Sequence, residues 1–436
     1  MKAKVGRNEF KDTEIGRIPK EWEVVRLGDI TLPVVKIDPR KESGKEFKYV
    51  DITSIENNRI IGWNVINSKN APSRARQLIH SKDVIFATTR PYLKNIAVAS
   101  QELDGQICST GFCVIRPNKE CVISEWIFYN VLTERFISRT SSKMKGATYP
   151  AVSDKDVSNE KIPLPSLPEQ RKITEILSTV DEAIQRVDEA IARTERLKRG
   201  LMQRLLTRGI GHREFKDTEI GRIPKGWEVV RVGDIIEEIK NGFASGKRDE
   251  KGIVQIRMNN VTTDGRLIFD SYLKVPIPEN LDEWLLKKGD FLFNNTNSYD
   301  LVGKSTIFNG APFPCTFSNH FTRIRFKKEV LPELILHHFI VLWEKGYFKS
   351  VAIRHVGQSA VHTDYLLKLQ LPLPSPPEQH RIIEILSTVD KKLELERKRK
   401  EKLERIKRGL MNDLLTGRKR DAPEPRTEKD ESERRR

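Results

Sequence analysis

The stretch EQRKITEILSTVDEAIQRVDEAIARTERLKRGLMQRLLT at residues 169–207 returns at residues 378–416 as EQHRIIEILSTVDKKLELERKRKEKLERIKRGLMNDLLT. The two copies align without a gap and are identical at 20 of 39 positions. PLPSLPEQ at 163–170 and PLPSPPEQ at 372–379 lead into them, and such prolines stop the preceding chain and suit a helix start. The repeat therefore predicts two long, related helices.

Apolar residues step by four and three along both copies, which is the a/d spacing of a coiled-coil seam. Polar Glu396 and Lys400 interrupt the second copy, and such residues commonly fix register or oligomer state at some loss of stability. Because each helix leaves a different variable region, we predict that the two pair antiparallel about a pseudo-twofold axis. The predicted seam consists of Ile173, Leu177, Val180, Ile184, Val187, Ile191, Leu197, Leu201, Ile382, Leu386, Val389, Leu393, Leu403, Ile406 and Leu410.

A second repeat lies ahead of each helix. Residues 9–30 return at 214–235 with 20 of 22 positions identical, whereas the sequence between the repeats differs almost completely in the two halves. A drifted gene duplication is one explanation, but drift alone should erode the flanks about as fast as the middles. The other interpretation is that the constant flanks perform one job twice while each middle acts on a different target.

The variable regions are predicted to be mixed α/β. Residues 49–55, 83–88, 96–99 and 112–116 have strand composition, and 124–138 and 332–348 have helical patterns. The predicted architecture is two α/β domains joined by a pair of long antiparallel coiled-coil helices. Its predicted boundaries are 1–165 and 209–374 for the domains, 166–208 and 375–416 for the helices, and 417–436 for a disordered basic tail.

Charge narrows the possible partners. Among 436 residues, 78 Lys and Arg against 61 Asp and Glu give a net charge of +17, which favours a polyanion as partner, although the surplus could also serve only solubility. The four cysteines form no CxxC pair, no apolar run reaches the length of a membrane helix, and the first twenty residues lack a secretory pattern. These features predict a cytoplasmic protein.

Catalytic motifs are not found. Gly303-Lys304-Ser305 ends like a phosphate loop, but Ser298 stands where that motif needs glycine. The Asn/Asp-Pro-Pro-aromatic, GxGxxG and HExxH patterns are also missing from the sequence. We therefore predict a chain with no catalytic residue, no metal site and no cofactor of its own.

Polar and basic loops that follow strands remain as candidates for binding double-stranded DNA. Arginine pairs with guanine and asparagine with adenine in the major groove, so loops that differ in these residues would read different bases. Arg74, Arg76, Lys247 and Arg248 could instead hold phosphates, which position a protein without specifying sequence. Any of these residues could also be plain surface. The candidate readers are Arg90, Tyr92, Lys94, Lys143, Lys145 and Thr148 in the first domain and Asn294, Asn295, Asn297, Tyr299, Arg354, Gln358 and Ser359 in the second.

The duplicated architecture, IGRIPKEWE at 15–23, IGRIPKGWE at 220–228 and the two PEQ helices resemble the DNA-specificity subunit of Type I restriction-modification enzymes. The resemblance implies that each variable unit is a target recognition domain reading one half of a bipartite, asymmetric DNA site. It implies that the helices set the spacer and dock two methyltransferase (modification) subunits, which bind S-adenosylmethionine and methylate adenine. Restriction subunits would use ATP and magnesium to cut DNA. None of this chemistry would lie in the present chain.

Two other functions are compatible with the residues. A self-contained DNA-binding nuclease with an unrecognised site predicts metal-dependent cleavage by the chain alone. A non-catalytic structural or regulatory coiled-coil protein predicts neither a sequence preference nor a methyltransferase partner.

Overall fold

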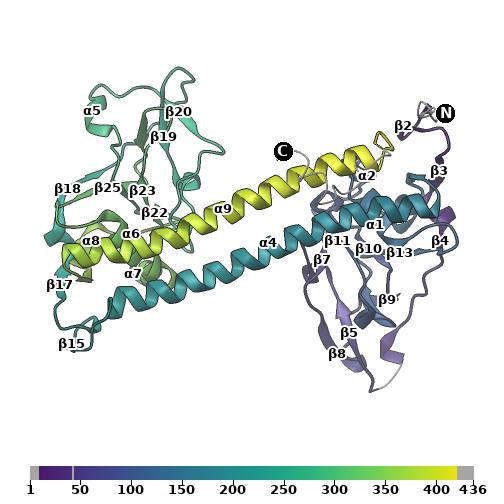
Figure 1. Ribbon diagram of the computed structural model, residues 1–436, viewed down its shortest axis with the longest axis horizontal. Coiled ribbons are helices and arrows are strands. Elements are labelled where there is room, and N and C mark those ends of the chain that lie inside the picture. The colour runs from purple at the N-terminus through teal and green to yellow at the C-terminus, as the bar shows by residue number, and fades with distance from the viewer. Residues whose placement is uncertain (1–8, 42–43, 420–436) are drawn as a thin grey trace, which may run out of the picture. The chain divides into compact units, whose positions relative to one another are not determined.

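The computed structural model describes residues 9–41 and 44–419, and its contacts divide the chain into two compact units. Unit 1 consists of Met1–Asp188 and Arg399–Arg436, and unit 2 of Glu189–Lys398. The two long helices, α4 (Leu167–Arg208) and α9 (Pro376–Leu414), each begin in one unit and end in the other (Figure 1). Each unit therefore combines one variable domain with half of each helix.

Unit 1 is built on two four-stranded sheets, of order β11-β10-β13-β4 and β8-β5-β12-β9. Within them only β5 and β12 pair in parallel. A further antiparallel pair joins β3 to β14, at the two ends of the variable region. The strands are β1 (Phe10–Thr13), β2 (Gly16–Pro19), β3 (Glu23–Arg26), β4 (Thr31–Leu32), β5 (Glu46–Val50), β6 (Ile55–Glu56), β7 (Arg59–Ile60), β8 (Asn64–Asn67), β9 (Ala75–Ile79), β10 (Val84–Ala87), β11 (Ile96–Val98), β12 (Gln106–Ser109), β13 (Phe112–Pro117) and β14 (Lys161–Leu164).

The helix predicted over 124–138 is two helices, α1 (Ser124–Val131) and α2 (Glu134–Ser141), followed by the short α3 (Asp154–Ser158). The Thr133 hydroxyl accepts a hydrogen bond from the backbone N–H of Phe136 and caps α2, which explains the break. Apolar side chains of α1 and α2 pack with Phe86 of β10 and with Trp22 in the core of unit 1.

Unit 2 repeats this plan. A sheet of order β18-β25-β21-β23 lies beside β20-β19-β24, and β17 pairs antiparallel with β28 as β3 does with β14. Its helices are α5 (Leu281–Trp284), α6 (Pro332–Glu344), α7 (Tyr347–Val351) and α8 (Thr363–Lys368), so the helix predicted over 332–348 is also broken, here at Gly346. The strands are β15 (Phe215–Thr218), β16 (Gly221–Pro224), β17 (Glu228–Arg231), β18 (Ile236–Asn241), β19 (Ile253–Ile256), β20 (Leu273–Val275), β21 (Asp290–Asn294), β22 (Thr296–Asn297), β23 (Ser305–Phe308), β24 (Cys315–Phe317), β25 (Phe321–Phe326), β26 (Ile353–His355), β27 (Gln358–Ala360) and β28 (Gln370–Leu373).

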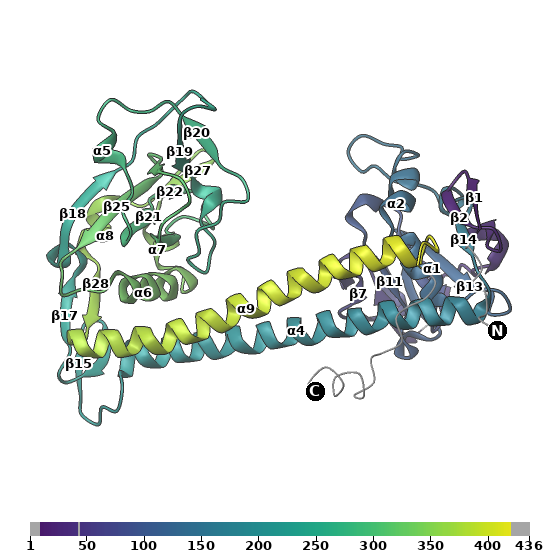
Figure 2. The ribbon, with the colours of Figure 1, turned by 45° about the horizontal axis from the view of Figure 1, so that its top comes forward.

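Inside each unit the halves of α4 and α9 lie side by side and antiparallel (Figure 2). Four ion pairs show the direction, because the residue numbers of the partners on α9 decrease as those on α4 increase. In unit 1, Asp181 pairs with Lys407 and Asp188 with Lys400. In unit 2, Glu195 pairs with Arg397 and Lys198 with Asp390. The fold class and the antiparallel pairing of the helices are thereby confirmed.

Two of these ion pairs join the constant motifs to each other. Asp181 and Asp390 close the two EILSTVD motifs, and Lys407 and Lys198 open the two KRGLM motifs. Asp181 pairs with Lys407 at 2.6 Å in unit 1, and Asp390 pairs with Lys198 at 2.6 Å in unit 2. The same pair thus forms once in each unit, as the sequence duplication requires.

The seam follows the predicted phase except at two positions. Leu177, Val187, Ile382 and Leu386 are buried, among others, but Leu197 and Ile406 are 53% and 40% exposed, so they were wrongly placed in the seam. Lys198 and Lys407, which follow them, occupy the facing positions through their ion pairs. Lys400, expected to weaken the seam, joins it by pairing with Asp188.

Breaking the Asp181–Lys407 pair should destabilise unit 1. Both side chains are about four-fifths buried, and the carboxylate also accepts a 2.8 Å hydrogen bond from the Tyr129 hydroxyl. Asp181→Asn leaves the Lys407 ammonium without its counter-charge, so we expect a loss of about 1–3 kcal/mol in unfolding free energy. A double-mutant cycle with Lys407→Met in urea should show coupling above ~1 kcal/mol. Glu182→Gln, which removes an exposed pair with Arg186 on the same helix, should change stability by less than ~0.5 kcal/mol.

The remaining constant motifs fasten the start of each helix to its domain. The indole Nε1 of Trp22 donates to Glu169 at 3.0 Å, and that of Trp227 donates to Glu378 at 2.8 Å. Gln170 is fully buried, donates to the Cys121 and Pro165 carbonyls and accepts from the Ile123 N–H. The equivalent Gln379 makes the matching set with Glu329, Pro374 and Leu331. The WE and PEQ motifs are therefore structural.

Adjacent histidines should make unit 2 sensitive to acid. Burial lowers the pKa of both His337 and His338 on α6 to about 3, with Lys198 adding to the effect on His337. In the unfolded chain these histidines have the ordinary pKa near 6.5, so between pH 6.5 and about pH 3 the unfolded state binds more protons than the folded state. The free energy of unfolding should therefore fall as the pH drops below about 6.5. His337→Tyr/His338→Asn, which installs the residues at the equivalent positions of α1, should flatten this fall in thermal melts of the full chain.

Within the described ranges, no helix is both long and apolar enough to cross a membrane.

Candidate nucleic-acid interface

In unit 1, two loops that are far apart in the sequence meet at the end of β10. One is the β10–β11 loop with Arg90, and the other is the segment before Ala151. Thr89 and Ala151 form an antiparallel bridge, and the Arg90 N–H donates to the Pro150 carbonyl at 2.9 Å. The Arg90 guanidinium lies 5.8 Å from the centre of the Tyr149 ring. Both loops had been picked out as candidates for DNA binding, and the structure brings them together.

Arg90 and Lys94 hold the β10–β11 loop in an unusual shape. Both residues have left-handed backbone angles, with φ of 51° and 54°, which non-glycine residues adopt at some energetic cost. The Asn58 amide donates to the Lys94 carbonyl at 2.6 Å and helps to fix this conformation. Strained residues of this kind cluster at binding sites, where the surrounding structure over-determines them.

Unit 2 forms the equivalent surface from the same two parts of its domain. β22 pairs antiparallel with β27, so that Asn297 lies opposite Ser359, and β27 pairs in turn with β26. The Arg354 guanidinium stacks 3.7 Å from the centre of the Tyr299 ring, and the Lys349 ammonium lies 4.7 Å from it. Each domain thus presents an arginine–tyrosine contact between its two candidate loops.

The predicted residues divide by exposure. Three cations with an expected role in binding are engaged in ion pairs: Arg76 with Asp38, Lys94 with Glu134 and Lys143 with Glu160. Tyr299 is half-buried beneath Arg354. The exposed residues are Arg74, Arg90, Tyr92, Lys143, Lys145, Thr148, Lys247, Arg248, Arg354 and Gln358.

The asparagine loop of unit 2 departs from its expected role. Asn294 is fully buried, and its amide donates to the Thr296 and His320 carbonyls while its oxygen accepts from Asn297 at 2.6 Å. Asn297 and Ser359 are buried as well, and the Asn295 amide donates to the Thr322 hydroxyl. Amides used inside the domain cannot also face a base edge, so in this structure these residues shape the loop and lie beneath its surface.

Several exposed side chains beside these loops had not been predicted. Tyr149 is 73% exposed, and Val356, at the turn between β26 and β27, is fully exposed with Ile353 close by in sequence. The signal was available in the turn residues Gly146, Pro150 and Gly357, which mark both segments as projecting loops. Apolar groups of this kind can contact the methyl group of thymine.

Lys304, the lysine of the near-miss phosphate loop, has a structural role. Its ammonium is buried and donates to the Val261 carbonyl at 2.6 Å and to the Met258 carbonyl at 3.2 Å, and burial lowers its pKa. In the described part of the chain, no three His, Cys, Asp or Glu side chains come together as a metal site would require.

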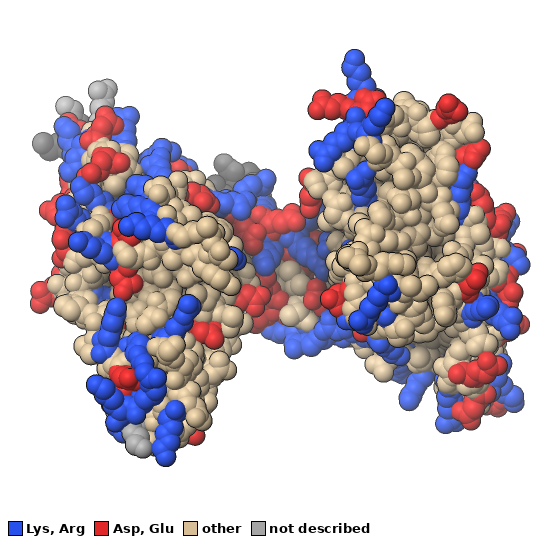
Figure 3. Space-filling model, turned by 180° about the vertical axis from the view of Figure 1, so that it is seen from behind, with Lys and Arg blue, Asp and Glu red and all other residues tan. Residues whose placement is uncertain are grey.

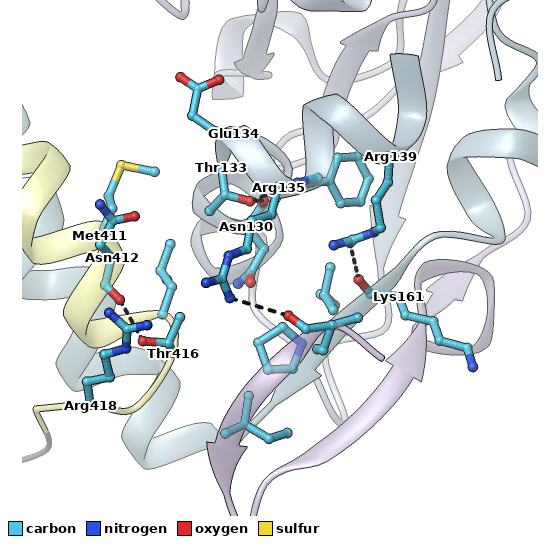
Figure 4. A pocket seen from close by; sticks show the side chains of 16 residues that line it. Asn130, Thr133, Glu134, Arg135, Arg139, Lys161, Met411, Asn412, Thr416 and Arg418 are labelled. Carbon is cyan, nitrogen blue, oxygen red and sulfur yellow. Dashed lines mark hydrogen bonds between the residues drawn. The ribbon is translucent and has the colours of Figure 1, made fainter. Parts of the chain in front are cut away.

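A cavity with a volume of about 240 Å³ lies in unit 1 among α2, the β1–β2 hairpin and the end of α9 (Figure 4). The Arg135 guanidinium lies between the hairpin and α9, and donates to the Ile15 carbonyl at 3.5 Å. Arg139 lines the opposite wall and donates to the Lys161 carbonyl at 2.9 Å. The cavity is lined by the hairpin, by α1 and α2, by β14 and by the end of α9, and its lining residue Glu134 pairs with Lys94 of the β10–β11 loop.

Lysine and arginine are spread over both units with acidic residues between them (Figure 3). On unit 1 the basic side chains gather at the end formed by β5 and β8. These strands belong to the same sheet as β9, which begins directly after Arg74. Such a distribution suits contact with phosphates, which hold a protein in register on DNA.

Known proteins resemble this chain over most of its length. The family model described as Type I restriction modification DNA specificity domain matches residues 19–193 and 224–405. The MjaVIII Type I restriction enzyme specificity subunit of Methanocaldococcus jannaschii is 29% identical over 94% of this chain and 95% of its own. A solved chain from work on complex assembly and conformational transition of the type I R-M system aligns with a TM-score of 0.55 and 29% identity, over 92% of this chain and 99% of that one.

The S subunit of the Type I system from M. genitalium, at 14% identity and a TM-score of 0.53, shares the fold. The match in two separate blocks agrees with the two variable domains, each bounded by constant segments. The chain belongs to the Type I restriction-modification DNA specificity family and is a non-catalytic specificity subunit with two target recognition domains.

Proposed function

We propose that each unit reads one half of a bipartite, asymmetric DNA site through its pair of converging loops. The observation that carries this proposal is the contrast between the two surfaces: Arg90 lies against Tyr149 in one unit, whereas Arg354 stacks on Tyr299 in the other, in loops at corresponding places of the two domains. Domains with the same frame and different reading loops suit two unequal half-sites.

The helices would fix the distance between the half-sites and dock two methyltransferase subunits, which carry S-adenosylmethionine and methylate adenine. Restriction subunits would bring ATP- and magnesium-dependent cleavage. We further propose a cytoplasmic location, because Cys108, Cys113, Cys121 and Cys315 are all free thiols.

Mapping DNA methylation tests the proposed function. A cell expressing this chain together with the adenine methyltransferase subunit that we propose as its partner should show a gapped, two-part adenine motif across its genome. A control cell lacking only this chain should lose that motif. Methylation that persists in the control would contradict the proposal, as would metal-dependent cleavage by the purified chain alone.

Arg354 should contribute to base recognition in one half-site. It is exposed, and stacking on Tyr299 pre-orients its planar guanidinium for a bidentate contact with guanine. Arg354→Ala should weaken binding to the intact site by about 1–3 kcal/mol and relax the preference at one position, which competition titrations with single-base variants would show. Arg248→Ala, expected to remove a phosphate contact, should instead weaken all sequences alike. If Arg354→Ala weakened binding equally for all sequences, Arg354 would not be a residue that recognises a base.

A further inference from the structure

A third polar segment lies beside the candidate loops of unit 2. β19 and β24 are parallel neighbours, so Arg257 and Ser318, which directly follow them, lie at the same edge of the sheet. Two residues further on, the His320 carbonyl accepts a 3.0 Å hydrogen bond from the Asn295 N–H. The Asn295 carbonyl in turn accepts from the Val361 N–H, just after β27, at 2.8 Å. This edge of the sheet is therefore bonded to both candidate loops.

Hydrogen-bond donors gather at this edge without acceptors. Nε of Arg257, Oγ of Ser318 and Nδ1 of His320 are buried and have no hydrogen-bond partner among the described residues. All three atoms can donate, and a buried donor without an acceptor is costly. The arginine and histidine side chains are partly exposed, so a ligand can reach them. A group that only accepts hydrogen bonds would satisfy the three donors together.

Electrostatics also favours an anion at this edge. Burial, and then the charge of Arg257, lower the pKa of the His320 ring. The ring therefore lies in the positive potential of the guanidinium, which an anion between the two groups would stabilise. Charge-assisted hydrogen bonds from such groups to an anion are stronger than those between neutral partners.

The equivalent edge of unit 1 has the opposite chemistry. β5 and β12 are the matching parallel pair, and Asp51 follows β5 where Arg257 follows β19. Gly111 takes the place of His320, because the Thr88 N–H donates to its carbonyl at 2.8 Å, as a loop N–H does in unit 2. An aspartate at this edge would repel the anion that an arginine attracts. The site therefore belongs to one domain of the two.

The turn that follows β19 does not depend on the arginine side chain. In unit 1 the Asp51 carboxylate caps the corresponding turn by accepting two backbone N–H groups at 2.9 and 3.2 Å. In unit 2 the Asn260 side chain accepts from the Arg257 N–H at 2.9 Å, while the Arg257 side chain makes no capping hydrogen bond. The buried Lys304 ammonium holds the same turn through the Met258 carbonyl. These contacts leave the guanidinium available for a ligand.

We propose that Arg257, Ser318 and His320 form a subsite for one backbone phosphate in the half-site that unit 2 reads. The inference rests on the proposed function, which brings DNA to the adjoining loops. Phosphate oxygens accept hydrogen bonds and donate none, as the three donors require. The segment that carries Lys247 and Arg248 begins with a parallel bridge to Ser318, so these two cations continue the same phosphate-binding surface. The guanine edge also only accepts, and the experiment separates it from a phosphate.

The test replaces single phosphates by uncharged methylphosphonates in duplexes that carry the two-part motif. Competition titrations with the full chain measure the affinity, and exchange of residues 233–368 identifies the half-site of unit 2. Neutralising one phosphate in that half-site should weaken wild-type binding about ten-fold. Arg257→Gln should lose a similar factor on the unmodified duplex and no longer respond to that methylphosphonate. Its plot of log affinity against log salt concentration should be shallower by about 1.

Two further variants separate the subsite from net charge and from folding. Arg222→Gln is the matched control, because Arg222 is an exposed arginine of unit 2 in the constant β15–β16 hairpin. This control should keep the affinity and the methylphosphonate response of the wild type. His320→Gly installs the residue that unit 1 carries at this place, which suits the same backbone. It should reduce the methylphosphonate response while the melting temperature stays close to that of the wild type.

The outcomes distinguish the subsite from the function on which it rests. An Arg257→Gln variant that keeps the wild-type response at every phosphate would overturn the subsite, as would a responding phosphate in the half-site of unit 1. A relaxed preference at one base pair, with unchanged salt dependence, would assign Arg257 to a guanine and overturn the phosphate contact. A wild-type chain that does not distinguish the two-part motif from other DNA would overturn the proposed function itself.

Discussion

Replacing residues 28–159 with the corresponding region of another specificity subunit is expected to change one half of the methylated motif and leave the other unaltered. The structure favours a clean exchange because the variable region leaves and re-enters the constant frame at one place. β3 pairs antiparallel with β14, and Arg26 at the end of β3 lies opposite Lys161 at the start of β14. Next to this pair, the Leu27 N–H donates to the Glu160 carbonyl at 2.9 Å. The segment between these contacts holds both four-stranded sheets and one core cluster of its own, and its helices α1 and α2 pack against the constant frame at Trp22 and Ile173.

The reciprocal exchange provides the control. In unit 2, Arg231 pairs with Gln370, and the Val232 N–H donates to the Leu369 carbonyl at 2.8 Å, so residues 233–368 form the equivalent module. Exchanging that module should change the other half of the motif only. Methylation mapping of both chimaeras would decide, and a chimaera in which both halves change would contradict independent reading.

Trp22→Ala should destabilise unit 1 by about 3–5 kcal/mol, the usual loss for removing a fully buried large aromatic side chain. Trp22 is 1% exposed, packs edge-on against Trp126 at 5.6 Å between ring centroids, and donates to Glu169. It also contacts the far end of the chain: a Cβ added to Gly417, just after α9, would come within 3.3 Å of its ring. Losing this ring removes the support for the start of α4 and the end of α9 together.

Hydrogen exchange would locate the effect. In Trp22→Ala, protection of the backbone amides should fall first at residues 10–19 and 399–417. The amides of unit 2 should keep their protection. Trp22→Phe, which keeps most of the apolar surface but loses the hydrogen bond, should lose only about 1–2 kcal/mol. Trp227→Ala should move the same loss to unit 2, where Gly209 and Glu378 surround that indole. If Trp22→Ala alone caused an equal loss of protection in both units, the division of the chain into two separately stabilised units would be contradicted.

Periodicity and repetition in the sequence predicted the helices, their antiparallel pairing and the mixed α/β domains. They failed at Leu197 and Ile406 because a heptad pattern scores apolarity alone. Lys198 and Lys407 take the facing positions through carboxylate partners that come from the other helix. Such partners cannot be identified before the register between the helices is known.

The candidate interface was predictable only in part. Loops rich in polar residues after strands identified the segments around Arg90 and Arg354, and the structure brings each together with its partner loop. Which side chains face outward was not predictable. Asn294 and Asn297 have the composition of reading residues, but they bond to each other and to carbonyls beneath the loop. Side-chain direction in an irregular loop depends on its tertiary contacts.

The division of the helices between the units bears on how the protein is made. Unit 1 includes residues from Arg399 onward, among them Leu414 and Leu415 of its core. A ribosome that adds about 5–20 residues per second needs roughly 10–45 s to proceed from the first half of α4 to these residues. The domain translated first is therefore completed last, and a premature stop near the 3′ end of the message would damage the amino-terminal domain while leaving its own codons intact.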